Sequence, residues 1–414
     1  MEEWKEYKLE ETTDFIAGYA FKSKDFGSYE NKVVKIKDIQ PPFVSIASID
    51  GVNIHEYDIS KLAKYLVYKN DFLLAMTGAT IGKIGRYIYD KPVYLNQRIL
   101  KFMPKVGFDS DFIYYSLISD SFQKFIINHI DSDSAQPNIS ANTIGKYRLY
   151  IPDITIQKKI SHVLKVLDSK IELNRRINDN LEQQAQTLFK SWLVDFDPFK
   201  NGKFVESEMG MIPEGWKVIS LQEYCQEITR GNIPTYVEKS NRPILNQKVN
   251  KGVSLEKQYY KYNSENVEVS ISKMAHYGDV LLNSLGQGTL GRVHLYKEKL
   301  GNVIIDQFIT ILRTNLFVKS AYLSYTLNRP EYQTIIEGNV TGSTGMWVLT
   351  INNVRNIKII VPKESCFLEL APIINSIYQA ISNNTAEMEQ LCTLRDCILP
   401  HLMSGELKIN DLNC

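Results

Sequence analysis

The strongest constraint on this chain is a stripe of apolar residues that runs through residues 160–192 at alternating steps of four and three. This spacing is typical of a coiled-coil seam, along which one edge of a long helix faces a partner helix. Adding 210 to each position gives a second stripe in residues 370–402, with the same polar interruption at Asn174 and Asn384. The sequence therefore predicts two long helices that pack on each other within one chain. The predicted helix-pair interface comprises Leu164, Leu167, Ile171, Asn174, Asn178, Leu181, Leu188, Ile374, Ile377, Ile381, Asn384, Met388, Leu391 and Ile398.

The polar interruptions predict how the two helices meet. Each helix leads away from a preceding body of about 150 residues, so the simplest packing is antiparallel, with a pseudo-two-fold axis between the bodies. An Asn buried in a seam fixes the register and lowers stability. We expect amides from the two helices, among them Asn178 and Asn384, to meet near this axis. The alternative is that these residues mark an end of the seam that is exposed to solvent.

Composition sets the class of protein. A chain of 414 residues with 44% hydrophobic residues and a net charge of +1 is typical of a globular protein with two or three domains, and it disfavours a uniformly basic nucleic-acid binder. Five scattered cysteines without a CxxC pair predict reduced thiols. The N-terminal residues lack an apolar core and no stretch reaches about 18 apolar residues. We therefore expect a cytoplasmic protein without a membrane partner.

The sequence predicts an α+β fold, in which two pseudo-symmetric mixed α/β domains are separated by a pair of long antiparallel coiled-coil helices. In the first body, short β-prone runs alternate with Gly, Pro, Asn and Asp turns, and residues 110–130 have helical apolar spacing. The predicted parts are a first domain (1–152), a first long helix (153–196), a linker (197–211), a second domain (212–362), and a second long helix with the C-terminal tail (363–414).

The second body repeats the first. Trp216-Lys217 echoes Trp4-Lys5, and Gln307 lies 210 positions after Gln97. The sequence between such anchors has diverged, which indicates an old duplication of one body plus one helix. Two related but non-identical bodies at a fixed separation suit a linear ligand with two non-identical half-sites. Double-stranded DNA is such a ligand, and bipartite readers space their modules by helical turns.

Several motifs occur in order along the chain. They are LAMTGATIG (74–82) with Asn-Gln-Arg (96–98), AQPNIS (135–140), WLVDFDP (192–198), GMIPEGWK (210–217) and LPHLMSGEL (399–407). Together they resemble the specificity (S) subunit of type I restriction–modification systems over essentially the whole chain. The second copy departs from the pattern, with GNVTGSTG (338–345) in place of AQPNIS. We interpret this departure as normal half-site variation.

The resemblance implies a function and partners. It implies two target recognition domains, each reading one half of a split DNA sequence, with the helical pair setting the gap. It also implies that two methyltransferase (modification) subunits dock on the helices and the domains, and that restriction (translocase/nuclease) subunits complete the complex. The chain itself is then a non-catalytic subunit.

The turn after the strand at residues 73–74 is the predicted DNA-contacting element. Glycines permit close backbone approach, hydroxyl and Lys side chains suit phosphates, and Gln or Arg suits purine edges. The alternative is that the Gly-Thr turns are hairpin chemistry and that the Gln side chains satisfy buried backbone groups. The candidates are Thr77, Gly78, Thr80, Lys83, Arg86, Gln97, Arg98, Gln136 and Asn138 in the first body, and Asn283, Ser284, Gln287, Thr289, Arg292, Gln307, Thr341 and Ser343 in the second.

The sequence gives little support for an enzymatic function. A GxGxxG segment (286–291) is followed by a strand-like run, so the helix N-terminus that binds the pyrophosphate in a dinucleotide site is not expected here. Gln-Pro-Pro-Phe (40–43) resembles the adenine-methyltransferase motif, but Gln departs from it and a turn is the better interpretation. The six histidines show no metal-ligand spacing. We expect no enzyme activity, no cofactor and no metal. The alternative function is a two-domain protein-binding scaffold without DNA specificity, from which salt-sensitive, sequence-dependent DNA binding would distinguish it.

Overall fold

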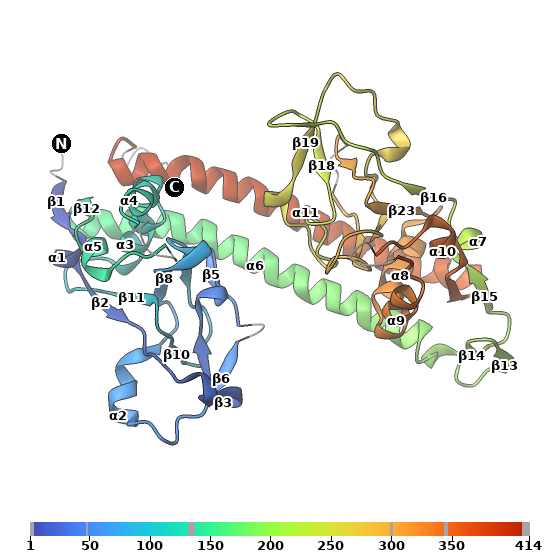
Figure 1. The fold of residues 1–414 in the computed structure, drawn as a ribbon, viewed down its shortest axis with the longest axis horizontal. Coiled ribbons are helices and arrows are strands. Elements are labelled where there is room, and N and C mark those ends of the chain that lie inside the picture. The colour runs from blue at the N-terminus through green and yellow to red at the C-terminus, as the bar shows by residue number, and fades with distance from the viewer. Residues whose placement is uncertain (1–3, 47–48, 131–136, 299–300, 343–346, 408–414) are drawn as a thin grey trace. The chain divides into compact units, whose positions relative to one another are not determined.

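The computed structural model describes residues 4–46, 49–130, 137–298, 301–342 and 347–407. Contacts divide the chain into unit 1, which comprises Met1–Glu172 and Met388–Cys414, and unit 2, which comprises Leu173–Glu387. Two long helices, α6 (Ile154–Leu193) and α11 (Glu364–Ser404), each contribute one part to unit 1 and the other part to unit 2. Figure 1 shows both helices as unbroken ribbons.

The described strands of unit 1 form three sheets. The six-stranded sheet has the order β2 (Thr13–Ala17), β11 (Ile99–Pro104), β8 (Phe72–Ala75), β9 (Ile84–Arg86), β5 (Phe43–Val44), β4 (Ile39–Gln40). The four-stranded sheet has the order β6 (Asp50–Val52), β3 (Phe26–Val34), β10 (Val93–Leu95), β7 (Leu66–Val67). Strands β1 (Lys5–Lys8) and β12 (Arg148–Ile151) form an antiparallel pair. The short helices are α1 (Leu9–Thr12), α2 (Ile59–Leu62), α3 (Ser110–Leu117), α4 (Asp120–Asn128) and α5 (Ala141–Gly145).

The core of unit 1 lies where the large sheet meets its helices. All four residues of β8 are buried, because both faces of this central strand are covered. The run at 110–130, predicted as one helix, is two: α3 ends at Leu117 and α4 begins at Asp120. Ser119 lies between them, and its hydroxyl donates to the Ser116 carbonyl oxygen. Such a local side-chain bond competes with continued helix and explains the break.

Unit 2 is built in the same way. Its main sheet has the order β16 (Glu227–Arg230), β23 (Ile309–Arg313), β20 (Val280–Asn283), β21 (Val293–Leu295). A second sheet has the order β17 (Tyr236–Val237), β19 (Lys261–Asn263), β18 (Pro243–Leu245), β22 (Ile304–Ile305), and β15 (Lys217–Ser220) pairs with β24 (Lys358–Val361). The helices are α7 (Leu221–Tyr224), α8 (Phe317–Asn328), α9 (Pro330–Gly338) and α10 (Ile351–Asn356).

The strand orders show the duplication. The order β2-β11-β8-β9 in unit 1 corresponds to β16-β23-β20-β21 in unit 2, with antiparallel pairs throughout. Each unit also has one parallel pair in its smaller sheet, β10 with β3 and β18 with β22. These matching topologies and the two long helices confirm the predicted α+β fold class.

The segment predicted as a linker contains regular structure. Strands β13 (Phe204–Ser207) and β14 (Gly210–Pro213) form an antiparallel hairpin. Ile212 is buried, and the rings of Phe196 and Phe199 pack edge-on against Trp216. Aromatic packing of this kind anchors the chain between α6 and β15 to unit 2.

The two long helices run antiparallel within each unit. In unit 2, Asn174 Nδ2 donates to Glu387 Oε2 (2.7 Å), and Asn384 Nδ2 donates to Asn178 Oδ1 (2.9 Å). The predicted meeting of amides from the two helices is therefore present. In unit 1, Arg395 Nη1 donates to Asp168 Oδ1 (2.9 Å), and a Tyr115 hydroxyl donates to the other oxygen of the same carboxylate (2.7 Å).

The predicted interface side chains are all at least half-buried. Leu164, Ile171, Asn174, Ile374 and Ile381 are buried, and the other nine are intermediate. No described helix combines the length and apolar character that a membrane crossing requires.

Candidate nucleic-acid interface

Unit 1 places a tight turn at the end of β8. The turn contains the short 3-10 helix Gly78–Thr80 and leads into β9. Gly78 and Gly82 have positive φ angles of 74° and 81°, a region that favours glycine. A Cβ on Gly78 would meet nothing within 4 Å, so the backbone here is open to an approaching ligand.

Two further loops lie beside this turn. Met76 N donates to Arg98 O (2.9 Å), Gly78 N donates to Pro137 O (3.0 Å), and Ile139 N donates to Met76 O (3.0 Å). Residues 76–83, 96–98 and 137–139 therefore form one surface, which we call cluster 1. Backbone bonds fix the frame of this surface.

Most unit 1 candidates lie on cluster 1. Lys83, Gln97, Arg98 and Asn138 are exposed. Gly78 and Thr80 are half-buried, and Thr77 is buried. Gln136 lies outside the described residues. The exposed Gln97 side chain favours a contact role over the alternative that it satisfies buried backbone.

Arg86 requires a different interpretation. Its side chain is buried, forms an ion pair with Asp111, and stacks 4.1 Å from the centre of the Tyr114 ring. Lys165 Nζ also bonds Asp111 (2.7 Å), so these groups join β9 to α3 and α6. Burial opposes ionisation, but the paired cations hold the pKa of Asp111 below its usual value. We therefore revise the prediction for Arg86, because its guanidinium supports the fold.

Unit 2 forms the same arrangement. Ser284 N donates to Phe308 O (2.9 Å), and Leu349 N donates to Ser284 O (2.9 Å). Thr341 and Val348 exchange two backbone bonds of 2.9 and 2.8 Å. Residues 284–291, 306–308, 341–342 and 347–349 form cluster 2. The isolated bridge between Leu285 and Val348 corresponds to that between Thr77 and Asn138 in unit 1.

Some candidate side chains of unit 2 are accessible at the surface, and others hold the turn through hydrogen bonds. Gln287 and Thr341 are exposed, and Thr289, Arg292 and Gln307 are half-buried. The Arg292 guanidinium donates to backbone oxygens of Asn250 (3.3 Å) and Gly288 (3.0 Å), which ties it to the turn. Ser343 lies outside the described residues.

Asn283 and Ser284 are fully buried. Asn283 Nδ2 donates to Gln247 O (3.1 Å) and Thr289 O (3.0 Å), and its Oδ1 accepts from Asn250 Nδ2 (2.9 Å). The Ser284 hydroxyl bonds that of Thr310 (2.6 Å). We revise both predictions, since these side chains hold the turn and offer no surface to a ligand.

Two motifs with enzyme-like spacing are turns in the structure. The segment Gly286–Gly291 leads into the strand β21, as its sequence predicts, and offers no helix N-terminus. Gln40-Pro41-Pro42-Phe43 connects β4 to β5, with Gln40 paired opposite Phe43. That prediction of a turn is confirmed.

Three side chains near cluster 2 were not predicted from the sequence. Trp347 is 50% exposed and lies next to Val348, two residues after the segment 338–345 that departs from the AQPNIS pattern. Arg230, the last residue of β16, donates from Nη2 to Leu349 O, and Lys273 Nζ donates to the neighbouring Thr229 hydroxyl (2.8 Å). Only the large exposed aromatic carried a signal in the sequence, since the positions of the two cations depend on strand pairing.

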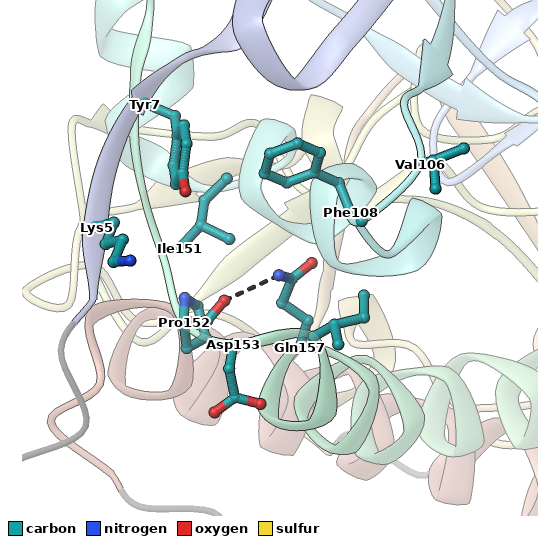
Figure 2. Close-up of a pocket in the computed structure, with 10 residues that line it drawn as sticks. Lys5, Tyr7, Val106, Phe108, Ile151, Pro152, Asp153 and Gln157 are labelled. Atoms are coloured by element: carbon teal, nitrogen blue, oxygen red, sulfur yellow. Dashed lines mark hydrogen bonds between the residues drawn. The ribbon is translucent and has the colours of Figure 1, made fainter.

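A hollow of about 600 Å³ lies at the start of α6, with walls from β1, β12 and residues 106–108. Figure 2 shows Gln157 at its base, with Nε2 donating to Pro152 O (2.9 Å). Gln157 Oε1 also accepts from Asp109 N (2.8 Å). This buried amide already has partners on both sides, so the hollow carries no argument for a ligand.

Comparisons with known proteins agree with this geometry. Residues 1–183 match the family model described as "Type I restriction modification DNA specificity domain". The chain is 26% identical to the type I restriction enzyme MjaIX specificity subunit of Methanocaldococcus jannaschii, over 87% of this chain and 83% of that protein. It is 24% identical to the HindI specificity subunit of Haemophilus influenzae, over 98% of this chain and 100% of that protein. The crystal structure of an S subunit from M. genitalium shares the fold, with a TM-score of 0.53, 14% identity and 96% coverage of both chains.

Proposed function

Because the chain belongs to the family of type I restriction–modification specificity subunits, we propose that it reads a bipartite site on double-stranded DNA. Residues 1–152 and 212–362 are the two target recognition domains, and each reads one half of the site. The observation that carries this proposal is the repetition of one backbone frame with different side chains. Cluster 1 presents Gln97, Arg98 and Asn138, whereas cluster 2 presents Gln287, Gln307 and Thr341.

The side chains of both clusters suit base reading. Gln and Asn amides match the donor and acceptor edge of adenine, and Arg matches guanine in the major groove. Since the same turn carries different residues in each unit, the two half-sites differ in sequence. The antiparallel pairing of α6 with α11 supports the further proposal that these helices set the gap between half-sites.

In the proposed complex this chain supplies recognition and other subunits supply catalysis. Two modification subunits dock on the helices and the domains, and restriction subunits join that assembly. The chain itself holds no cofactor in this scheme. The alternative of a protein-binding scaffold is not favoured, because the matched family model is a DNA specificity domain.

The test is selection of DNA by the full chain in complex with its modification subunits. We expect enriched duplexes to contain two short blocks at a fixed separation, and binding to weaken steeply with salt. With six to ten phosphate contacts, affinity falls by roughly 10³–10⁵ between 50 and 200 mM salt. Enrichment of no block, or binding that is indifferent to salt, would contradict the proposal.

Matched variants assign the blocks to the domains. Gln97→Ala should relax base preference within one block, and Gln287→Ala should relax it within the other, because each exposed amide lies on a different cluster. Loss of one good base contact corresponds to about 1–3 kcal/mol at that position. Relaxation of both blocks by one variant would show that the clusters do not act separately.

A further inference from the structure

Arg230 occupies an unusual place beside cluster 2. It ends β16, pairs across the sheet with Thr310, and is half-buried. Its Nη2 donates to Leu349 O, and Leu349 belongs to cluster 2. Thr310 in turn bonds the Ser284 hydroxyl. The guanidinium therefore lies against the framework that holds the reading turn.

A second cation adjoins it. Lys273 is half-buried, and its Nζ donates to the Thr229 hydroxyl (2.8 Å) and to the backbone oxygen of Arg230. These acceptors are neutral oxygens. In the described part of the chain, Arg230 Nη1 is buried and has no hydrogen-bond partner. The undescribed segments nearest in sequence to cluster 2, residues 299–300 and 343–346, contain no Asp or Glu.

Several other buried or half-buried arginines have carboxylate partners, whereas Arg292 bonds backbone oxygens. Arg313 in the same unit bonds Asp279 (2.8 Å) and Glu227 (2.8 Å). In unit 1, Arg86 pairs with Asp111 and Arg395 with Asp168. Burial lowers the pKa of Arg230 from its usual value, which expresses the unfavourable desolvation of this cation. A largely buried charge without an opposite charge lowers stability, and an anion that arrives with a ligand offsets this cost.

We propose that Arg230 and Lys273 bind a backbone phosphate of the DNA whose bases cluster 2 reads. This inference rests on the proposed function and adds a site to it. Phosphate contacts position a reader on the duplex and carry no sequence information, and the planar guanidinium suits two phosphate oxygens. The equivalent strand position in unit 1 is Ala17, paired opposite Leu100 as Arg230 is opposite Thr310. The anchor therefore belongs to the second domain alone.

The experiment measures binding of the full chain with its modification subunits to the selected duplex at several salt concentrations. Arg230→Met should reduce the slope of log affinity against log salt by about one, and should leave both sequence blocks unchanged. Its thermal midpoint should stay level or rise, because an apolar side chain replaces an unpaired buried cation. A purely structural arginine would give the opposite pattern, a lower midpoint with an unchanged salt slope.

Three further proteins make the result decisive. Lys358→Met, in the same unit but paired with Glu208, should leave the salt slope unaltered. Arg230→Lys should keep most of the slope, and Lys273→Gln should reduce it even if Arg230→Met fails to fold. An unchanged slope in folded Arg230→Met or Lys273→Gln overturns the phosphate site while wild-type binding stands. Absence of sequence-specific binding by the wild type overturns the proposed function itself.

Discussion

At the scale of single residues, a buried amide decides the shape of the second reading turn. Asn283 links Gln247, Thr289 and Asn250 through three hydrogen bonds. Asn283→Ala leaves these buried groups without partners, so we expect the unfolding free energy of unit 2 to fall by about 1–3 kcal/mol. Denaturant unfolding measures this change.

The matched control for that variant is Gln287→Ala on the same turn. Gln287 is exposed, so its removal should change stability by no more than about 0.5 kcal/mol. Its effect should appear in base preference instead. Equal stability losses in Asn283→Ala and Gln287→Ala would show that stabilising the turn and contacting DNA are not divided between these two side chains.

His294 is a second residue whose burial makes a prediction. Burial, followed by the nearby Lys297, lowers the pKa of His294 to about 4 from the usual 6.5. Its Nδ1 lies 2.7 Å from Gly252 O. Below pH 6.5 the His294 imidazole binds a proton in the unfolded chain, whereas in the folded chain it binds one only near pH 4. Stability should therefore fall as the pH drops through this window and be unaffected by His294 above it.

Removing the imidazole isolates this effect. In His294→Gln the fall in thermal midpoint between pH 6.5 and 4 should be smaller than in the wild type, by the equivalent of at most about 3 kcal/mol. His162 lies exposed on α6, so His162→Gln is the matched control and should retain the wild-type profile. Identical profiles for wild type and His294→Gln would contradict the assignment.

Residue types alone could not distinguish side chains that contact DNA from side chains that stabilise the fold. Arg86, Asn283 and Ser284 have the chemistry of DNA contacts, and the sequence places them beside Gly-Thr turns. Their burial follows from partners such as Asp111 and Asn250, which lie 25 and 33 positions away. Long-range pairing of this kind has no local sequence signal, whereas the turns themselves were predictable from their glycines.

At the scale of elements, the periodicity of the long helices was sufficient to predict them. Steps of four and three persist over many turns, so the apolar seam is unambiguous and its amides mark the register. The broken helix at 110–130 was less predictable, because one Ser hydroxyl bond decides where α3 ends. The hairpin β13-β14 was missed because it is short and contains turn-forming residues.

The amide pair in the seam gives an element-scale prediction. Asn178→Leu leaves the Asn384 amide without its present partner and removes one donor to the Thr385 hydroxyl, so it should lower the thermal midpoint. Asn384→Leu should do the same. The double variant should be more stable than the sum of the single effects predicts, by about 0.5–3 kcal/mol, because two apolar side chains then face each other. Additive effects in this double-mutant cycle would show that the amides do not interact.

At the scale of the whole molecule, duplication explains why one chain carries two clusters with the same backbone frame. The frame of each cluster comes from the same strand order, and the loops between the strands have diverged. Under the proposed function, the shared frame sets how each domain approaches DNA, and the diverged loops set which bases it meets. In this proposal the loops determine which bases each half-site contains, and the helices determine the gap between the half-sites.

This separation predicts the result of lengthening both helices together. Seven residues inserted into α6 and seven into α11, at facing positions beside the bond between Asn178 and Asn384, preserve the apolar seam in both. Each insertion adds about 10.5 Å of helix, which corresponds to about three base pairs at about 3.4 Å each. Selection of DNA by the complex should return the same two blocks with a gap longer by about that number.

The control is an insertion in one helix only. Seven residues added to α6 alone displace its seam against α11, so the amides lose their partners and assembly with the modification subunits should weaken. If the paired insertion changes the bases within either block, the clusters are not independent of the helices. If it preserves both the blocks and the original gap, the helices do not set the spacing, and the loops alone must determine the site.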